Sequence, residues 1–221
     1  MEEKESPEFW RALKPGSTIS LKDAQALEDS MKAGLGVSAR DYVVREVRSI
    51  KQLEGPVEWQ FFNVEDGDER LWFLVKIVDE DIALRMYFEL EGLQPGTRSE
   101  MIEREMSWLF QEPKDPDDFR CNELAYAEEI IQAIEVEGEE KEICFRIKPQ
   151  GELHGSCTHE PRQSWPPVMM ATIVEYVSQQ ACENPELLLL ELGGERGEDG
   201  GVITLFQGCD VRFSEVDVLA V

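Results

Sequence analysis

Apolar and polar residues alternate with a period of two along much of the chain after residue 40. One face of "RLWFLVKIV" holds Leu71, Phe73, Val75 and Ile77, and one face of "DIALRMYFEL" holds Ile82, Leu84, Met86 and Phe88, opposite Arg85 and Glu89. This period predicts β-strands. Because the second face is polar, we expect an antiparallel sheet that meets water on one side.

A hairpin is predicted between the segments "VEWQFFNV" and "RLWFLVKIV". Asp66 and Gly67 separate them, and an Asp-Gly pair favours the positive φ that a tight turn requires. Trp59 and Trp72 lie on these two strands, so we expect both to pack in the core or across the hairpin. The preceding segment "DYVVREVRSI" is predicted to be a further strand.

The second half of the chain follows the same pattern. "EIIQAIEVEGEEKEICFRIKP" predicts two strands around an acidic turn at Gly138, and "PELLLLELGG", "GGVITLFQGCDVRF" and "SEVDVLAV" predict three more. The segment 168–180 fits either a helix or a strand, but its β-branched residues Thr172, Ile173, Val174 and Val177 favour a strand. The shared plan of the two halves is consistent with a distant structural repeat.

Helices are predicted in three short segments. "LKDAQALEDSMKAGLG" predicts a helix over about 22–33 that ends at Gly34 and Gly36, "FWRAL" predicts one turn near the N-terminus, and "TRSEMIEREMSWLF" predicts a helix that begins at Thr97 or Ser99.

The clearest break in the chain is "QEPKDPDDFRCNE", which holds two prolines and several acidic residues. We place a domain boundary there, near residue 118. The predicted fold class is therefore α+β and mainly β. It comprises two antiparallel β modules of the small barrel or sandwich type, at residues 1–118 and 119–221, with two or three short helices.

Composition narrows the classes of function. Forty-seven acidic residues against 22 basic residues give a formal charge of −25, which repels a phosphate backbone and speeds the encounter with a basic protein partner. The acidic N-terminus lacks the features of a secretory signal, and no apolar run is long enough to span a bilayer. We therefore expect a cytoplasmic protein with no nucleic-acid partner and no membrane insertion. Five widely spaced cysteines without a CxxC pair indicate reduced thiols.

The candidate metal ligands are His154, Cys157 and His159, in the stretch "GELHGSCTHEP". Imidazole and thiolate groups bind zinc or copper. Cys157 and His159 would share one side of a strand, and a bend at Gly155 and Ser156 would bring His154 round. A structural zinc site needs a fourth ligand, for which Cys144 on a neighbouring strand is the candidate. The alternative is an exposed loop or strand end with no cofactor.

No catalytic or nucleotide-binding motif follows any predicted strand. Trp165, next to Pro166 and Pro167, is a candidate contact residue for a protein partner, although packing explains it as well. We therefore expect a protein-interaction module without catalytic activity. The alternative is a metal-binding protein or enzyme centred on His154, Cys157 and His159.

Residues 41–78 resemble a bacterial family known only as a domain of unknown function. The family pairs a strand of the form Y-x-V with two Trp-bearing strands around an acidic turn. The matching residues are Tyr42, Val44, Trp59, Asp66, Gly67, Trp72 and Leu74. The resemblance implies a small β-barrel-like or sandwich module, and it carries no residue roles to this chain.

Overall fold

The structure is a computed structural model of the chain. It describes residues 3–22, 40–67, 69–90, 93–111, 125–136, 139–160, 168–178, 186–193 and 201–221. The predicted helix over 22–33, the turn at Gly138, the boundary near residue 118 and Trp165 fall wholly or mainly outside these ranges.

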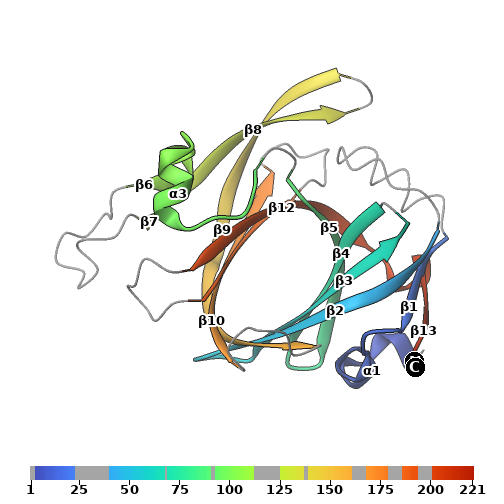
Figure 1. Cartoon of the computed structure of the whole chain (residues 1–221). Helices are drawn as coiled ribbons and strands as arrows, with labels where there is room; N and C mark the ends of the chain where they lie inside the picture. Colours follow the sequence, from blue (N-terminus) through green and yellow to red (C-terminus); the bar gives the residue numbers. More distant parts are fainter. Residues whose placement is uncertain are drawn as a thin grey trace.

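Eight antiparallel strands close into a β-barrel, which forms the body of the molecule (Figure 1). The first half of the chain contributes β2 (Arg40–Gln52), β3 (Val57–Asp66), β4 (Glu69–Val78) and β5 (Asp81–Glu89). The second half contributes β9 (Glu139–Glu160), β10 (Met169–Ser178), β11 (Glu186–Leu192) and β12 (Val202–Val211). The order around the barrel is β2-β3-β4-β5-β12-β11-β10-β9, and β9 pairs with β2 to close it. The mainly β prediction is confirmed, including a strand within residues 168–180.

Two long-range pairings between barrel strands join the halves: β5 with β12, and β2 with β9. The apolar side chains that face inward form one cluster to which all eight strands contribute. Its members are Ile50, Trp59, Phe61, Trp72, Leu74, Tyr87, Cys157, Met169, Ala171, Ile173, Leu188, Leu190, Leu192 and Phe206. The two halves therefore share one interior, and neither closes a barrel by itself.

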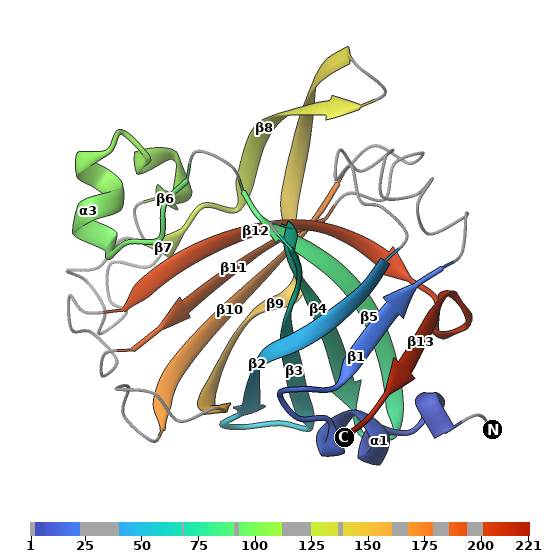
Figure 2. The ribbon, with the colours of Figure 1, turned by 45° about the vertical axis from the view of Figure 1, so that its right-hand side comes forward.

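Terminal elements cover the outer face of β2 to β5 and of part of β12 (Figure 2). They are η1 (Glu3–Glu5), α1 (Pro7–Ala12), β1 (Thr18–Leu21), η3 (Phe213–Glu215) and β13 (Val216–Leu219). Trp10 of α1 packs on Phe62 and Phe213, with ring centroids 5.8 Å away in each case.

The sequence-based prediction that one face of these strands meets water is wrong. The residues at 71, 73, 75 and 77 are buried beneath the terminal elements, and the opposite face lines the barrel. Arg85, expected on the wet face, has a side chain only 11% exposed and points into the interior.

A second set of short elements covers the outer face of β9 to β12. It comprises α3 (Arg98–Glu103), η2 (Ser107–Leu109), β6 (Phe110–Gln111) and β7 (Ala125–Tyr126). Of the two candidate caps, Thr97 is the residue at which α3 begins. Its hydroxyl accepts from the Glu100 backbone N–H, and the Glu100 carboxylate accepts from the Thr97 N–H, which satisfies two amides that the helix leaves free.

β8 (Glu129–Val136) forms a hairpin with the first part of β9, and this hairpin projects beyond the barrel (Figure 1). Nearer the barrel, β9 carries a large, irregular bulge. Four residues, 148–151, lie between Ile147 and Glu152, where β10 has only Glu175. Pro149 is tolerated in a strand at such a position, since a bulged residue need not donate to the ladder. Lys148 belongs to the bulge, and its Nζ lies 2.8 Å from Glu186 and 4.0 Å from Glu175.

The helices of the described residues are short. Both α1 and α3 contain six residues. None is long and apolar enough to cross a membrane.

Candidate functional site

The three predicted metal ligands lie on β9 but not on one face of it. Cys157 is buried in the barrel interior, and His159 points to the same side, with Nε2 3.0 Å from Glu46 Oε1. His154 lies three residues before Cys157, so it faces the opposite side of the strand. Its Nδ1 is 3.0 Å from Thr172 Oγ1. The barrel wall therefore separates His154 from the other two.

The expected bend at Gly155 and Ser156 is not present, because both residues pair with β2 and β10 within a continuous strand. Cys144 belongs to β9 itself and is paired with β8 rather than placed beside Cys157. Among the described residues, no group of three or more His, Cys, Asp and Glu side chains could hold a metal ion.

Cys157 is poorly suited to act as a thiolate. Burial raises the pKa of its thiol to about 11, against the opposing effect of the Arg48 charge. The thiol is therefore protonated at neutral pH, whereas a nucleophile or metal ligand is used as the thiolate.

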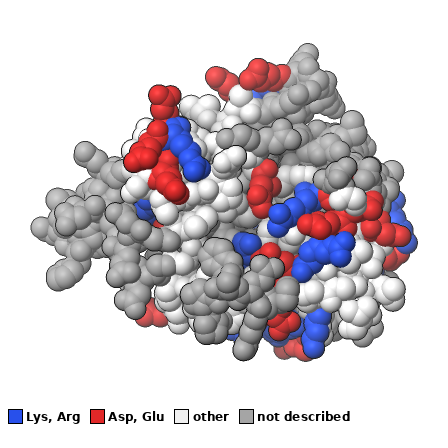
Figure 3. All heavy atoms as spheres, in the orientation of Figure 1, with Lys and Arg blue, Asp and Glu red and all other residues white. Residues whose placement is uncertain are grey.

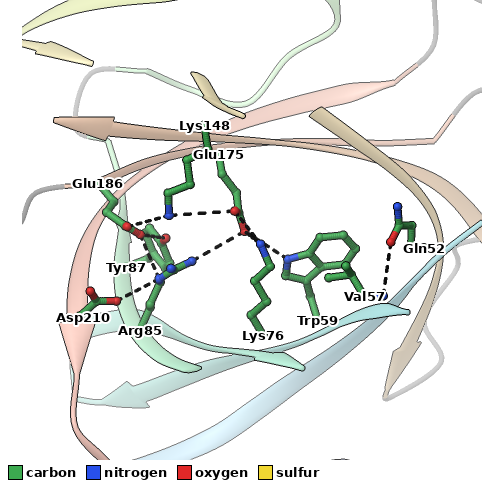
Figure 4. A network of polar contacts seen from close by, with 10 residues as sticks. All are labelled: Gln52, Val57, Trp59, Lys76, Arg85, Tyr87, Lys148, Glu175, Glu186 and Asp210. Carbon is green, nitrogen blue, oxygen red and sulfur yellow. Dashed lines mark hydrogen bonds and ion pairs between the residues drawn. The ribbon is translucent and has the colours of Figure 1, made fainter. Parts of the chain in front are cut away.

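Two polar clusters line the inner face of the barrel, and each includes one side chain that is more than half exposed, Asp210 in the first and Arg70 in the second. The first, which we call the Glu175 cluster, is drawn in Figure 4 and consists of Trp59, Lys76, Arg85, Tyr87, Lys148, Glu175, Glu186 and Asp210. These residues come from both halves of the chain and converge on the two buried glutamates. Lys76 Nζ donates to both carboxylate oxygens of Glu175, at 2.9 and 2.7 Å, and Trp59 Nε1 donates to the same group at 3.4 Å.

The Glu175 cluster balances its own charge. Lys148 Nζ, Tyr87 Oη and Arg85 Nε surround Glu186 at 2.8, 3.1 and 3.0 Å. Arg85 Nε is also 3.0 Å from Asp210. Three basic side chains thus face three acidic ones, so the cluster has no excess charge with which to attract a ligand. We interpret it as a structural network at one end of the barrel interior.

The second cluster lies further along the barrel. We call it the Asn63 cluster, and it consists of Glu46, Arg48, Asn63, Arg70, Trp72 and His159. The register places Asn63 opposite Glu46 on β2 and opposite Trp72 on β4, and it places Arg48 opposite His159 on β9. Asn63 is four residues from Trp59 along β3, about 13 Å at the usual rise of a strand.

Two arginines surround the indole of Trp72. The guanidinium carbon of Arg48 is 4.5 Å from the ring centroid, and that of Arg70 is 6.0 Å away. Arg48 Nε forms an ion pair with Glu46. Arg70 Nε donates to Asn63 Oδ1 at 3.0 Å, which fixes the orientation of the amide. Stacking on an aromatic face is a preferred arrangement of guanidinium groups, and it leaves their edges free to donate.

The Asn63 cluster has a buried donor without an acceptor. Asn63 is 1% exposed, and its buried Nδ2 has no hydrogen-bond partner among the described residues. Arg48 is held through Nε by Glu46, and its terminal nitrogens are not among the buried atoms that lack a partner. An unsatisfied buried amide costs about 1–3 kcal/mol, so an acceptor that reached it would be favoured. The Glu175 cluster also holds one buried donor without a hydrogen bond, Arg85 Nη1, but that nitrogen lies 3.7 Å from Glu175 Oε1, which balances its charge.

The sequence contained one signal for this cluster. Asn63 follows Trp59 and Phe61 at a period of two, so it is a polar residue on an apolar face. Arg48 and His159 gave no such signal, because their proximity depends on the pairing of β2 with β9 across more than 100 residues.

No family model, curated protein or solved structure matches this chain. The arrangement of the residues themselves is therefore the basis for the functional proposal.

Proposed function

We propose that the protein is a binding protein that takes a small ligand with an oxyanion group, a carboxylate or a phosphate, at the Asn63 cluster. The observation that carries the proposal is the buried and unpaired Nδ2 of Asn63. Buried polar groups in folded proteins almost always have a partner, and an exception points to a missing water, ion or ligand.

The chemistry of the donors supports an oxyanion. The stacked guanidinium of Arg48 offers parallel N–H groups, which suit the two oxygens of a carboxylate or phosphate. Asn63 Nδ2 adds a donor from the neighbouring strand. Glu46 is already engaged by Arg48 Nε and lies beside His159, so its charge is compensated within the cluster.

A metal site centred on His154, Cys157 and His159 receives less support. His154 lies outside the barrel wall, and the Cys157 thiol is protonated at neutral pH. Neither feature argues against the binding of an anion at the Asn63 cluster.

The test is a titration of ¹⁵N-labelled protein with inorganic phosphate and, separately, with acetate, at ionic strength held constant with chloride. We expect a saturable shift of the Asn63 side-chain amide signal with one of the two anions. The anion that causes the shift identifies the ligand class, phosphate or carboxylate. Asn63→Asp keeps the acceptor for Arg70 but removes the donor, and Arg48→Gln removes the guanidinium. Each variant should weaken binding by at least about tenfold.

Lys51→Gln is the matched control, since it removes one positive charge from the outer face of the same strand. It should bind as the unmodified protein does. The proposal is wrong if neither anion gives saturable binding, or if Lys51→Gln weakens binding as much as Arg48→Gln does.

A further inference from the structure

We propose that β8 is a docking edge for an extended, basic segment of a partner protein. β8 is the last strand of its sheet, and in the described part of the chain it pairs only with β9. Its second edge therefore presents backbone N–H and C=O groups that another strand can pair with. The hairpin that carries β8 projects beyond the barrel (Figures 1 and 2).

β8 lacks three features that commonly blunt an edge strand, and the charges it carries are acidic. Natural edges are commonly blunted by lysine, proline or bulges. β8 reads "EIIQAIEV", with neither lysine nor proline, and its pairing with β9 is regular. Ile130 is buried against the covering elements of the barrel, whereas Ile131 is 66% exposed on the other face. Ile131 provides an apolar anchor at the free edge.

The charge of the hairpin selects the partner. The face that carries Ile131 also carries Glu129 and, on β9, Glu140 and Glu142. Arg146 is paired with Glu129 and is the basic residue of this face. Figure 3 shows acidic side chains at the outer end of the molecule, over the hairpin. Opposite charges across neighbouring strands stabilise pairing, so lysine or arginine at alternate positions fits this face.

A second copy of the chain is a poorer occupant of the same edge. Each copy carries a formal charge of −25, and two such molecules repel each other. The same charge attracts a basic segment and speeds its encounter with the protein. The edge thus combines a backbone that no other described strand pairs with and a charge that opposes self-association.

The experiment measures the binding of a peptide of alternating Lys and Val, matched in length to β8, to the full chain. We expect binding that weakens as salt is added, and slower amide exchange in β8. A Glu-Val peptide of the same length should not bind. Ile131→Lys introduces a like charge and removes the anchor, so it should lower affinity for the Lys-Val peptide by at least about tenfold.

Leu219→Lys is the control, because Leu219 is 70% exposed on β13, the strand at the opposite end of the sheet. It should leave peptide affinity unchanged. Equal losses in the two variants, protection of β13 in place of β8, or equal binding of the Glu-Val peptide would each overturn the proposal. So would a dimer of the chain, seen by sedimentation, that Ile131→Lys dissociates.

Discussion

At the scale of single residues, Glu175 is the side chain on which the interior depends most. It is 3% exposed and contacts Lys76 and Trp59 directly, with Arg85 and Lys148 within 4.0 Å. Glu175→Gln keeps the shape but leaves buried cations uncompensated. Removal of one partner from a buried ion pair costs about 3–5 kcal/mol, and we expect a loss of unfolding free energy in this range by urea denaturation.

Asp210→Asn is the matched control in the same cluster. Asp210 contacts Arg85 at 3.0 Å, but its side chain is 59% exposed, so solvent screens the pair. The cost should be below about 1 kcal/mol. Equal costs for the two variants would contradict the view that burial, rather than the number of ion pairs, sets the contribution of each carboxylate.

The pH dependence of stability provides a second test of Glu175. Burial opposes its ionisation, but the charges of Lys76, Lys148 and Arg85 outweigh burial and lower its pKa below the ordinary value of 4.5. A carboxylate with a lowered pKa stabilises the fold above its unfolded pKa and loses this contribution as the pH falls through the folded pKa.

The difference in unfolding free energy between the unmodified protein and Glu175→Gln should therefore be largest near neutral pH. It should shrink as the pH is lowered below about 4.5. Urea titrations at a series of pH values measure this difference. A difference that stays constant into acid would show that the loss is steric rather than electrostatic.

At the scale of elements, the bulge of β9 positions Lys148. Gly151 closes the bulge, and a Cβ there would lie 2.7 Å from Lys148 O and 2.8 Å from Glu175 O. Both are backbone atoms and cannot move aside without a shift of the strand. Gly151→Ala should therefore destabilise the protein by about 2 kcal/mol or more, through overpacking.

Gly67→Ala separates this effect from the loss of a glycine as such. Gly67 has φ +59°, and nothing lies within 4 Å of the added Cβ. Gly67→Ala should lower the unfolding free energy by about 1 kcal/mol, the cost of a left-handed backbone conformation at a residue with a side chain. Urea unfolding of both variants decides the matter, and the prediction fails if Gly67→Ala is the more damaging.

The elements that the sequence predicted are those with local causes. The hairpin of β3 and β4 follows from alternation and an Asp-Gly turn, and Gly67 has the positive φ expected of it. α3 begins at Thr97 because a Glu stands three residues on. The bulge of β9 was not predictable, since it depends on Glu175 of the partner strand.

The clusters were not predictable for a related reason. Alternation separates the two faces of a strand but does not say which face is inside. The apolar face is buried as predicted, but it packs beneath the terminal elements, and the face of Arg85, which was expected to meet water, lines the barrel interior. Alternation alone therefore predicts that the polar residues of a strand are exposed to solvent. In a closed barrel they can instead contact each other across the interior.

At the scale of the whole molecule, the domain boundary predicted near residue 118 would separate strands that share one interior. Each half retains four barrel strands but loses the pairings of β5 with β12 and of β2 with β9. Each half also exposes its part of the inner apolar cluster. Lys76 and Arg85 lie in the first half, and their partners Glu175 and Glu186 lie in the second.

We therefore expect residues 1–118 and 119–221, produced as separate fragments, to lack cooperative urea unfolding. An equimolar mixture should recover strand content by circular dichroism and unfold cooperatively, because association restores both the apolar interior and the charge balance of the Glu175 cluster. A mixture that carries Glu175→Gln should associate more weakly than the unmodified pair. Cooperative unfolding of either fragment alone would instead show two independent domains, as the proline-rich, acidic segment "QEPKDPDDFRCNE" predicts.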